Sequence, residues 1–188
     1  MFILYAVLTG LLIGVVSSGS LDRLGRLRLR WAPAIAIGML VQLALFSTPA
    51  GDALGPLAPW AYLASNALVL GAVARNILVP GLPLVFLGGS SNVVAIVANG
   101  GYMPVSPEAL AAMGRGAQTG YSNSRLVADV QLWPLTDLFA MPTWIPTANV
   151  FSIGDVMIGI GVAIAIVATM HGRSVMTGWP RLSGAPEH

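Results

Sequence analysis

The sequence has no cysteine and no lysine among its 188 residues. Without cysteine the chain forms no disulfide, holds no thiolate-bound metal or iron–sulfur cluster and offers no acylated lipoprotein cysteine. Without lysine it has no phosphate-binding loop of the P-loop kind. The two histidines, His171 and His188, lie near the C-terminal end of the sequence, outside the middle of any apolar run. We therefore expect no metal site and no cofactor.

Charge is also scarce, because only 9% of the residues are charged whereas 56% are hydrophobic. Soluble domains carry about a quarter charged residues, so a water-soluble fold of this composition is not expected. The net charge of +2 forms no concentrated basic patch, and we expect no nucleic-acid partner. The composition indicates a membrane protein whose immediate partner is membrane lipid.

Apolar runs long enough to enter a ~30 Å hydrocarbon core define the architecture. The first run lacks a basic leading region and a small-residue cleavage site, so it is expected to be a retained membrane helix and not a signal peptide. The prediction is an all-α, polytopic helical bundle in a single membrane domain, residues 1–188. Its five transmembrane segments are residues 1–17, 31–46, 60–79, 83–98 and 152–170.

Arginine distribution predicts the orientation, because loops on the cytoplasmic side are enriched in basic residues. Alternate crossing places seven of the nine arginines on one side and leaves Arg115 and Arg125 on the other. We expect the N-terminus outside, the C-terminus and a tail of residues 171–188 inside, and an outer loop of residues 99–151. Arginine alternates with leucine in residues 22–30. This pattern is typical of a basic loop that fixes the cytoplasmic side of the chain, or of a short amphipathic segment that lies on anionic headgroups.

Small residues recur at four-residue spacing in the first and last runs. Gly10 and Gly14 form a G-x-x-x-G pair, a spacing that lets helix backbones approach closely. Either a dimer seam between two chains or internal packing within one bundle satisfies this spacing. The last run carries Gly159 with Ala163 and Gly161 with Ala165, which makes it a packing surface as well.

Two loops join the apolar runs on the outer side. Residues 48–59 are rich in Gly and Pro and are predicted to be a short turn. In the longer loop, residues 99–105 predict a tight turn and an extended piece, and Ser106 followed by Pro107 predicts the start of a short interfacial helix. Aromatic residues of this loop are expected to anchor at the membrane interface; they are Tyr121, Trp133 and Trp144.

Asp155 is the one charged residue between positions 153 and 170, and an ionisable group at membrane depth needs a partner or a function. One interpretation is structural: Ser152 and Asp155 have the S-x-x-D spacing of a helix capping box. The other is a polar pocket in which Asn66, Asn92 and Asp155 converge. Both interpretations are compatible with the sequence.

The motifs NGGYMPV, residues 99–105, and NVFSIGDVMIGIGV, residues 149–162, resemble DUF5317, a family of small bacterial membrane proteins. The resemblance extends over nearly the whole chain. It implies the five-segment layout, the structured outer loop and a location in the bacterial cytoplasmic (inner) membrane. The family's role is unassigned, so the resemblance implies no activity.

The start of the last run also resembles the final helix of signal peptidase II, a membrane aspartic protease. That resemblance rests on residues 151–155 and 135–139 and on the Gly89 to Asn92 stretch. It implies that Asp155 is one member of a catalytic carboxylate pair. Three residues after Asn92, where that family has its other aspartate, this chain has Ala95. Proteolysis therefore requires Asp129 or Asp137 as the second carboxylate.

The leading functional hypothesis is a non-enzymatic accessory or scaffolding subunit of a membrane complex, or a small binding protein, with other membrane protein subunits as partners. The alternatives are a membrane-embedded aspartic hydrolase and a small transporter. If the chain is a hydrolase, the catalytic candidates are Asp155, Asp137 and Asp129. The candidate binding residues are Asn92, Asn99, Gly100, Gly101, Asn149, Ser152 and Asp155.

Overall fold

The computed structural model describes residues 2–114 and 124–173 and is mostly helical. A long helix occupies each predicted apolar run, with ends within about four residues of the expected ones. Proline in the first turn begins three of these helices, where its missing N–H costs no hydrogen bond. The long helices are α1 (Phe2–Val16), α3 (Ala32–Ser47), α5 (Ala58–Arg75), α6 (Leu82–Ala98) and α8 (Ile153–Met170).

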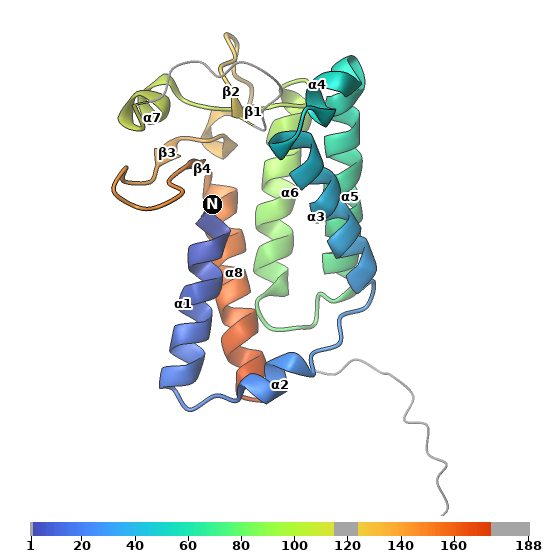
Figure 1. Cartoon of the computed structure of the whole chain (residues 1–188), viewed down its shortest axis with the longest axis vertical. Helices are drawn as coiled ribbons and strands as arrows, with labels where there is room; N and C mark the ends of the chain where they lie inside the picture. Colours follow the sequence, from blue (N-terminus) through green and yellow to red (C-terminus); the bar gives the residue numbers. More distant parts are fainter. Residues whose placement is uncertain (1, 115–123, 174–188) are drawn as a thin grey trace, which may run out of the picture.

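The contacts between the long helices run in the order α1, α8, α6, α5, α3, which is not their order in the sequence. In Figure 1, α1, α8 and α6 stand side by side and α3 lies in front of α5. The first and last helices pack extensively against each other, and α8 lies between α1 and α6. At the end of α3, Phe46 packs edge-on against Tyr62 of α5 with ring centroids 5.0 Å apart. This series of contacts ends in α1 and α3, which we call the edge helices.

Glycine allows the close contacts of α8 with both of its neighbours. A Cβ on Gly10 of α1 would lie 2.9 Å from the Cα of Ala163, and Gly14 abuts the side chain of Met170. On the other side, a Cβ on Gly161 would lie 2.6 Å from the carbonyl oxygen of Gly81 at the start of α6. The Gly10–Gly14 spacing therefore serves internal packing within one chain, the second of the two readings that the sequence allowed.

Among the residues that the structure describes, two helical stretches are long and apolar enough to cross a membrane. They are Ala50–Arg75, in which α4, η1 and α5 follow one another, and α8. The other apolar helices have 15, 16 and 17 residues, which at 1.5 Å per residue is about 22–26 Å, less than the ~30 Å hydrocarbon core. The count of five spans therefore stays a prediction.

The segment expected to be a short turn between residues 48 and 59 is helical instead, and that prediction is wrong. It contains α4 (Ala50–Leu54) and the 3-10 helix η1 (Gly55–Leu57). Pro49 precedes α4 with φ −64°, a value already helical, and Gly55 ends it with φ +50°. Proline and glycine therefore mark the two ends of a short helix here, just as they mark the ends of turns in loops.

The described residues between α6 and α8 form what we name the loop cap, which lies over one end of the helices (Figure 1). Its short strands pair β1 (Met103–Pro104) with β2 (Ser124–Arg125) in parallel, and β3 (Phe139–Ala140) with β4 (Val150–Phe151) antiparallel. The 3-10 helix η2 (Trp133–Leu135) lies between them. The sequence did not predict these pairings, because strands of two residues show no alternation.

One loop-cap helix, α7 (Pro107–Ala112), was predicted from its start signal. Ser106 is its N-cap, and the Ser106 hydroxyl accepts a hydrogen bond of 2.9 Å from the backbone N–H of Ala109. Trp133 and Trp144 are exposed, whereas the predicted anchor Tyr121 lies outside the described residues, as does most of the predicted tail.

The opposite end of the helices, which we name the arginine end, carries the short helix α2 (Leu21–Gly25) and the segment that follows it. Asn76, at the end of α5, holds this segment by its backbone. The Asn76 amide donates to the carbonyl of Arg30 at 2.7 Å and accepts from the Arg30 N–H at 2.8 Å. The link fixes the arginine–leucine segment across the ends of α5 and α8.

Candidate functional site

The start of α8 forms a complete capping box. Ser152, the N-cap, is fully buried, and its hydroxyl accepts a hydrogen bond of 3.0 Å from the backbone N–H of Asp155. In return, Oδ2 of Asp155 accepts a 3.0 Å hydrogen bond from the N–H of Ser152. The carboxylate also lies at the positive end of the α8 dipole, where negative charge is stabilised. The structural interpretation of Asp155 is therefore realised.

Asn92 of α6 completes this group. Its amide nitrogen donates to Oδ1 of Asp155 at 2.9 Å, and its amide oxygen accepts from the Ser152 hydroxyl at 2.8 Å. The three side chains thus form a closed hydrogen-bonded network, which we name the Asn92 network. It joins α6 to the N-terminus of α8 and uses both oxygens of the carboxylate.

Glycine makes room for the Asn92 network. A Cβ on Gly154 would collide with the amide oxygen of Asn92 and would lie 2.7 Å from the carbonyl oxygen of Gly88. The backbones of α6 and α8 therefore touch where the network forms. Asn66, the other residue proposed for a polar pocket, is not part of it: its amide donates to the carbonyl of Tyr62 in its own helix at 2.9 Å.

Neither proposed second carboxylate hydrogen-bonds to Asp155 in the part of the chain that the structure describes. Asp129 is exposed in the loop cap. Asp137 is buried, and its backbone joins that of β1 and of Ser106: its N–H donates to the carbonyl of Pro104 at 2.9 Å and its carbonyl accepts from Ser106 at 3.0 Å. Two carboxylates that share a proton must lie within hydrogen-bond reach, and Asp155 has no such neighbour here.

The second group of predicted site residues ends α6 and holds the loop cap. Gly100, with φ +71°, lets the Gly101 N–H bond back to the carbonyl of Ile96 at 2.8 Å, which is a Schellman C-cap. The Asn99 side chain then clamps the backbone of Gln131, donating to its carbonyl at 2.9 Å and accepting from its N–H at 2.8 Å. Gly101 lies directly on Pro59 of α5.

Asn92 and Asn99 stand seven residues apart on α6, so they share a helix face and lie about 10 Å apart along the axis. The structure therefore brings the predicted binding residues into two anchoring groups at the loop-cap end of one helix. Asn149 lies apart, in the segment before β4, where its carbonyl accepts from the N–H of Met141 at 3.0 Å.

Sequence reasoning missed the contacts that seat the loop cap on α1. The Phe151 ring stacks on Phe2 at 4.7 Å and on Phe139 at 5.4 Å, and the Tyr5 hydroxyl donates to the carbonyl of Pro146 at 2.5 Å. The aromatic residues near the predicted membrane interface could be found in the sequence, but the sequence did not show which of them contact one another. Gln131 could not be found at all, because only its backbone bonds to Asn99.

The described residues contain no group of three or more His, Cys, Asp or Glu side chains that could hold a metal ion. No curated protein and no solved structure matches the chain. The model of a family of unknown function, DUF5317, matches residues 26–167, well over half of the sequence. The chain therefore belongs to the DUF5317 family.

Proposed function

We propose that this protein crosses the bacterial cytoplasmic membrane five times, with its loop cap outside, and serves there without catalysis as an accessory or scaffolding subunit of a membrane complex. Exposed apolar side chains along the edge helices support the membrane location. Leu12 of α1 is 64% exposed and Leu40 of α3 is 62% exposed. Such continuous apolar faces are unfavourable in water and suit lipid or neighbouring membrane helices.

The Asn92 network is the observation that carries the non-catalytic assignment. Each polar atom of its three side chains that is named above has a hydrogen-bond partner, and both Asp155 oxygens accept from N–H groups. A carboxylate held this way is committed to joining two helices. A catalytic carboxylate must instead face its substrate and exchange a proton with a second group. The network supports a rigid platform for the loop cap.

Exposed aromatic residues on the loop cap supply a surface for a partner. Trp144 is 81% exposed and Trp133 is 61% exposed. Large aromatic side chains are enriched at the buried centre of protein interfaces and at membrane interfaces. We infer that another subunit of the complex covers this surface.

The orientation is testable directly, because a chain without cysteine is a ready background for single-cysteine labelling. Trp144→Cys on the loop cap is expected to react with an impermeant maleimide in intact cells. Arg28→Cys at the arginine end is expected to react only after the membrane is permeabilised. The reverse pattern would overturn the orientation, and labelling of both sites in intact cells would overturn the membrane-spanning assignment.

The accessory role is tested by extracting the protein in polymer-bounded discs of native membrane and quantifying all chains by mass spectrometry. We expect a second membrane protein at constant stoichiometry, retained when Asp155→Asn is introduced. The same samples are assayed for lipoprotein processing. Isolation of the chain alone, together with processing that is lost in Asp155→Asn and in either Asp129→Asn or Asp137→Asn, would replace this proposal with the hydrolase.

A further inference from the structure

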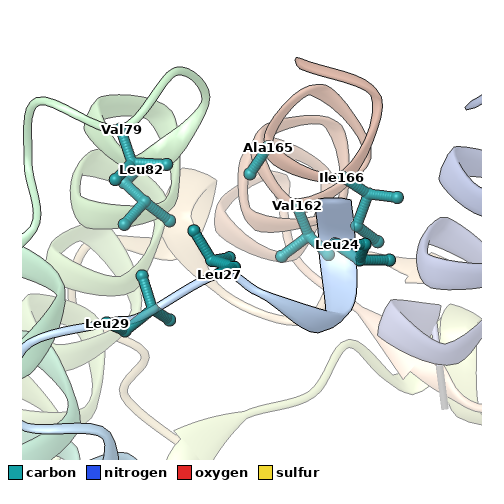
Figure 2. A pocket seen from close by; sticks show the side chains of 8 residues that line it. All are labelled: Leu24, Leu27, Leu29, Val79, Leu82, Val162, Ala165 and Ile166. Atoms are coloured by element: carbon teal, nitrogen blue, oxygen red, sulfur yellow. The ribbon is translucent and has the colours of Figure 1, made fainter. Parts of the chain in front are cut away.

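A half-open pocket of about 150 Å³ lies at the arginine end of the helices. Leucines of the α2 segment line one side, α8 lines the other, and Val79 and Leu82 of the α5–α6 connection close it. Figure 2 shows that every lining side chain is pure hydrocarbon. A pocket lined only by hydrocarbon favours an apolar guest, because the guest removes apolar surface from water. The lining from the two facing sides comprises Leu24, Leu27, Leu29, Val162, Ala165 and Ile166.

The segment that supplies the pocket's leucines carries arginines on its outer, exposed side. Along residues 27–30 the leucines are half-buried and the intervening arginines are exposed, so the segment presents hydrocarbon inward and guanidinium groups outward. Asp22 is the acidic residue at this end in the described part of the chain, and it pairs with Arg26. The described arginines at this end are Arg23, Arg26, Arg28, Arg30, Arg75 and Arg173.

The Arg23 guanidinium lies at the C-terminal end of α8. Its Nη1 is 3.3 Å from the position that a Cβ on Gly172 would occupy, just after α8 ends. Going outward past the end of α8, the chain therefore presents hydrocarbon and then a cation. A phospholipid carries its groups in the same order, with the acyl chains followed by the phosphate.

We propose that this pocket binds one acyl chain of an anionic phospholipid of the inner leaflet. The phosphate pairs with Arg23 and Arg28. The proposal rests on the membrane location given under the proposed function but not on an accessory role. Charge complementarity selects this occupant, because an apolar helix of a partner would leave the positive charge of the arginines unused.

The test measures binding to purified protein in neutral detergent by native mass spectrometry. Three probes are compared: short-chain phosphatidylglycerol, phosphatidylcholine with the same chains, and glycerol phosphate. Of the three probes, only phosphatidylglycerol combines acyl chains with a net negative headgroup, so it is expected to bind most tightly. We expect Arg23→Gln and Arg28→Gln each to weaken it about fivefold, and Arg125→Gln, on the loop cap, to leave it unchanged.

Two further variants separate the pocket from a general effect on folding. Ala165→Met fills the pocket and is expected to reduce phosphatidylglycerol binding at least tenfold, whereas Ile164→Met, at an exposed position on the same helix, is not.

Equal binding of phosphatidylcholine would overturn the role of the arginines, and equal binding of glycerol phosphate would overturn the role of the pocket. A photo-crosslink from position 165 to a protein partner in native discs would assign the pocket to that partner instead. Loss of the accessory role appears separately, as a missing stoichiometric subunit. Loss of the membrane location appears in the cysteine labelling.

Discussion

The contact between the start of α6 and the middle of α8 brings two backbones close together, and Gly81→Ala tests it. Gly81 has φ +89°, in the left-handed region, and its Cα hydrogens face α8. A Cβ there would collide with the carbonyl oxygen of Gly161 and would lie 2.8 Å from the backbone nitrogen of Ala165. These are backbone atoms, so no rotamer change can relieve the collision.

The expected loss has two parts. A left-handed conformation costs a residue with a Cβ about 1–2 kcal/mol. Overpacking against a rigid neighbour costs about 1–3 kcal/mol, because the helices must move apart. The two costs arise from different atoms and are expected to add, so Gly81→Ala should lower the free energy of unfolding by about 2–5 kcal/mol.

Three other glycines isolate the two parts. Gly100 has φ +71° and no atom within 4 Å of a built Cβ, so Gly100→Ala should cost about 1–2 kcal/mol, from the backbone alone. Gly161 is helical and close to α6, so overpacking in Gly161→Ala should lower the free energy of unfolding by about 1–3 kcal/mol. The better helix propensity of alanine should offset about 1 kcal/mol of that loss. Gly71 of α5 meets only Trp31, at 3.9 Å, so Gly71→Ala should stabilise by about 0.5–1 kcal/mol.

The measurement is unfolding of the purified proteins by titration with sodium dodecyl sulfate, followed by tryptophan fluorescence and circular dichroism. The expected order of stability is Gly71→Ala, wild type, Gly100→Ala and Gly81→Ala, with Gly161→Ala between wild type and Gly81→Ala. If Gly81→Ala is no less stable than Gly100→Ala, α6 and α8 do not approach as closely as the structure has them, and the reasoning fails.

Three smaller predictions follow from the anchoring groups. Asp155→Ala and Asn92→Ala should each destabilise by about 1–3 kcal/mol, and a double-mutant cycle should show coupling of about 0.5–3 kcal/mol; a coupling near zero would mean that the two side chains do not bond. Asn99→Ala should speed amide hydrogen exchange at Gln131, whereas Gln131→Ala should leave loop-cap exchange unchanged, because only its backbone is bonded. Ser106→Ala should cost about 1 kcal/mol of α7 stability, visible as faster exchange at the start of α7; unchanged exchange would contradict the cap.

The long helices could be predicted from the sequence because apolar runs and proline or glycine boundaries are local signals. The capping box at Ser152 and the N-cap at Ser106 are local too, and both are realised. Residues 48–59 show the limit of such signals, since the same Gly and Pro pattern fits a turn and a short helix. Composition alone does not decide between them.

Contacts between helices could be predicted only in part. One of the two interpretations of Asp155 placed Asn66, Asn92 and Asp155 together; Asn92 and Asp155 do hydrogen-bond, whereas Asn66 bonds within its own helix. A helix that is apolar all round carries no stripe that says which face packs inward. The partners of Asp155 therefore depend on where Gly88 and Gly154 allow two backbones to touch, which is a property of the pair and not of either segment.

The position of α8 between α1 and α6 has a consequence for synthesis on the ribosome. The glycine face of α1 is made first, and its partner α8 is made last of the long helices. Until α8 is synthesised, Gly10 and Gly14 of α1 and Gly81 and Gly88 of the α6 region lack the helix that they contact in the folded chain. Both contacts can form only when α8 is complete, so the fold closes around the long helix that is made last.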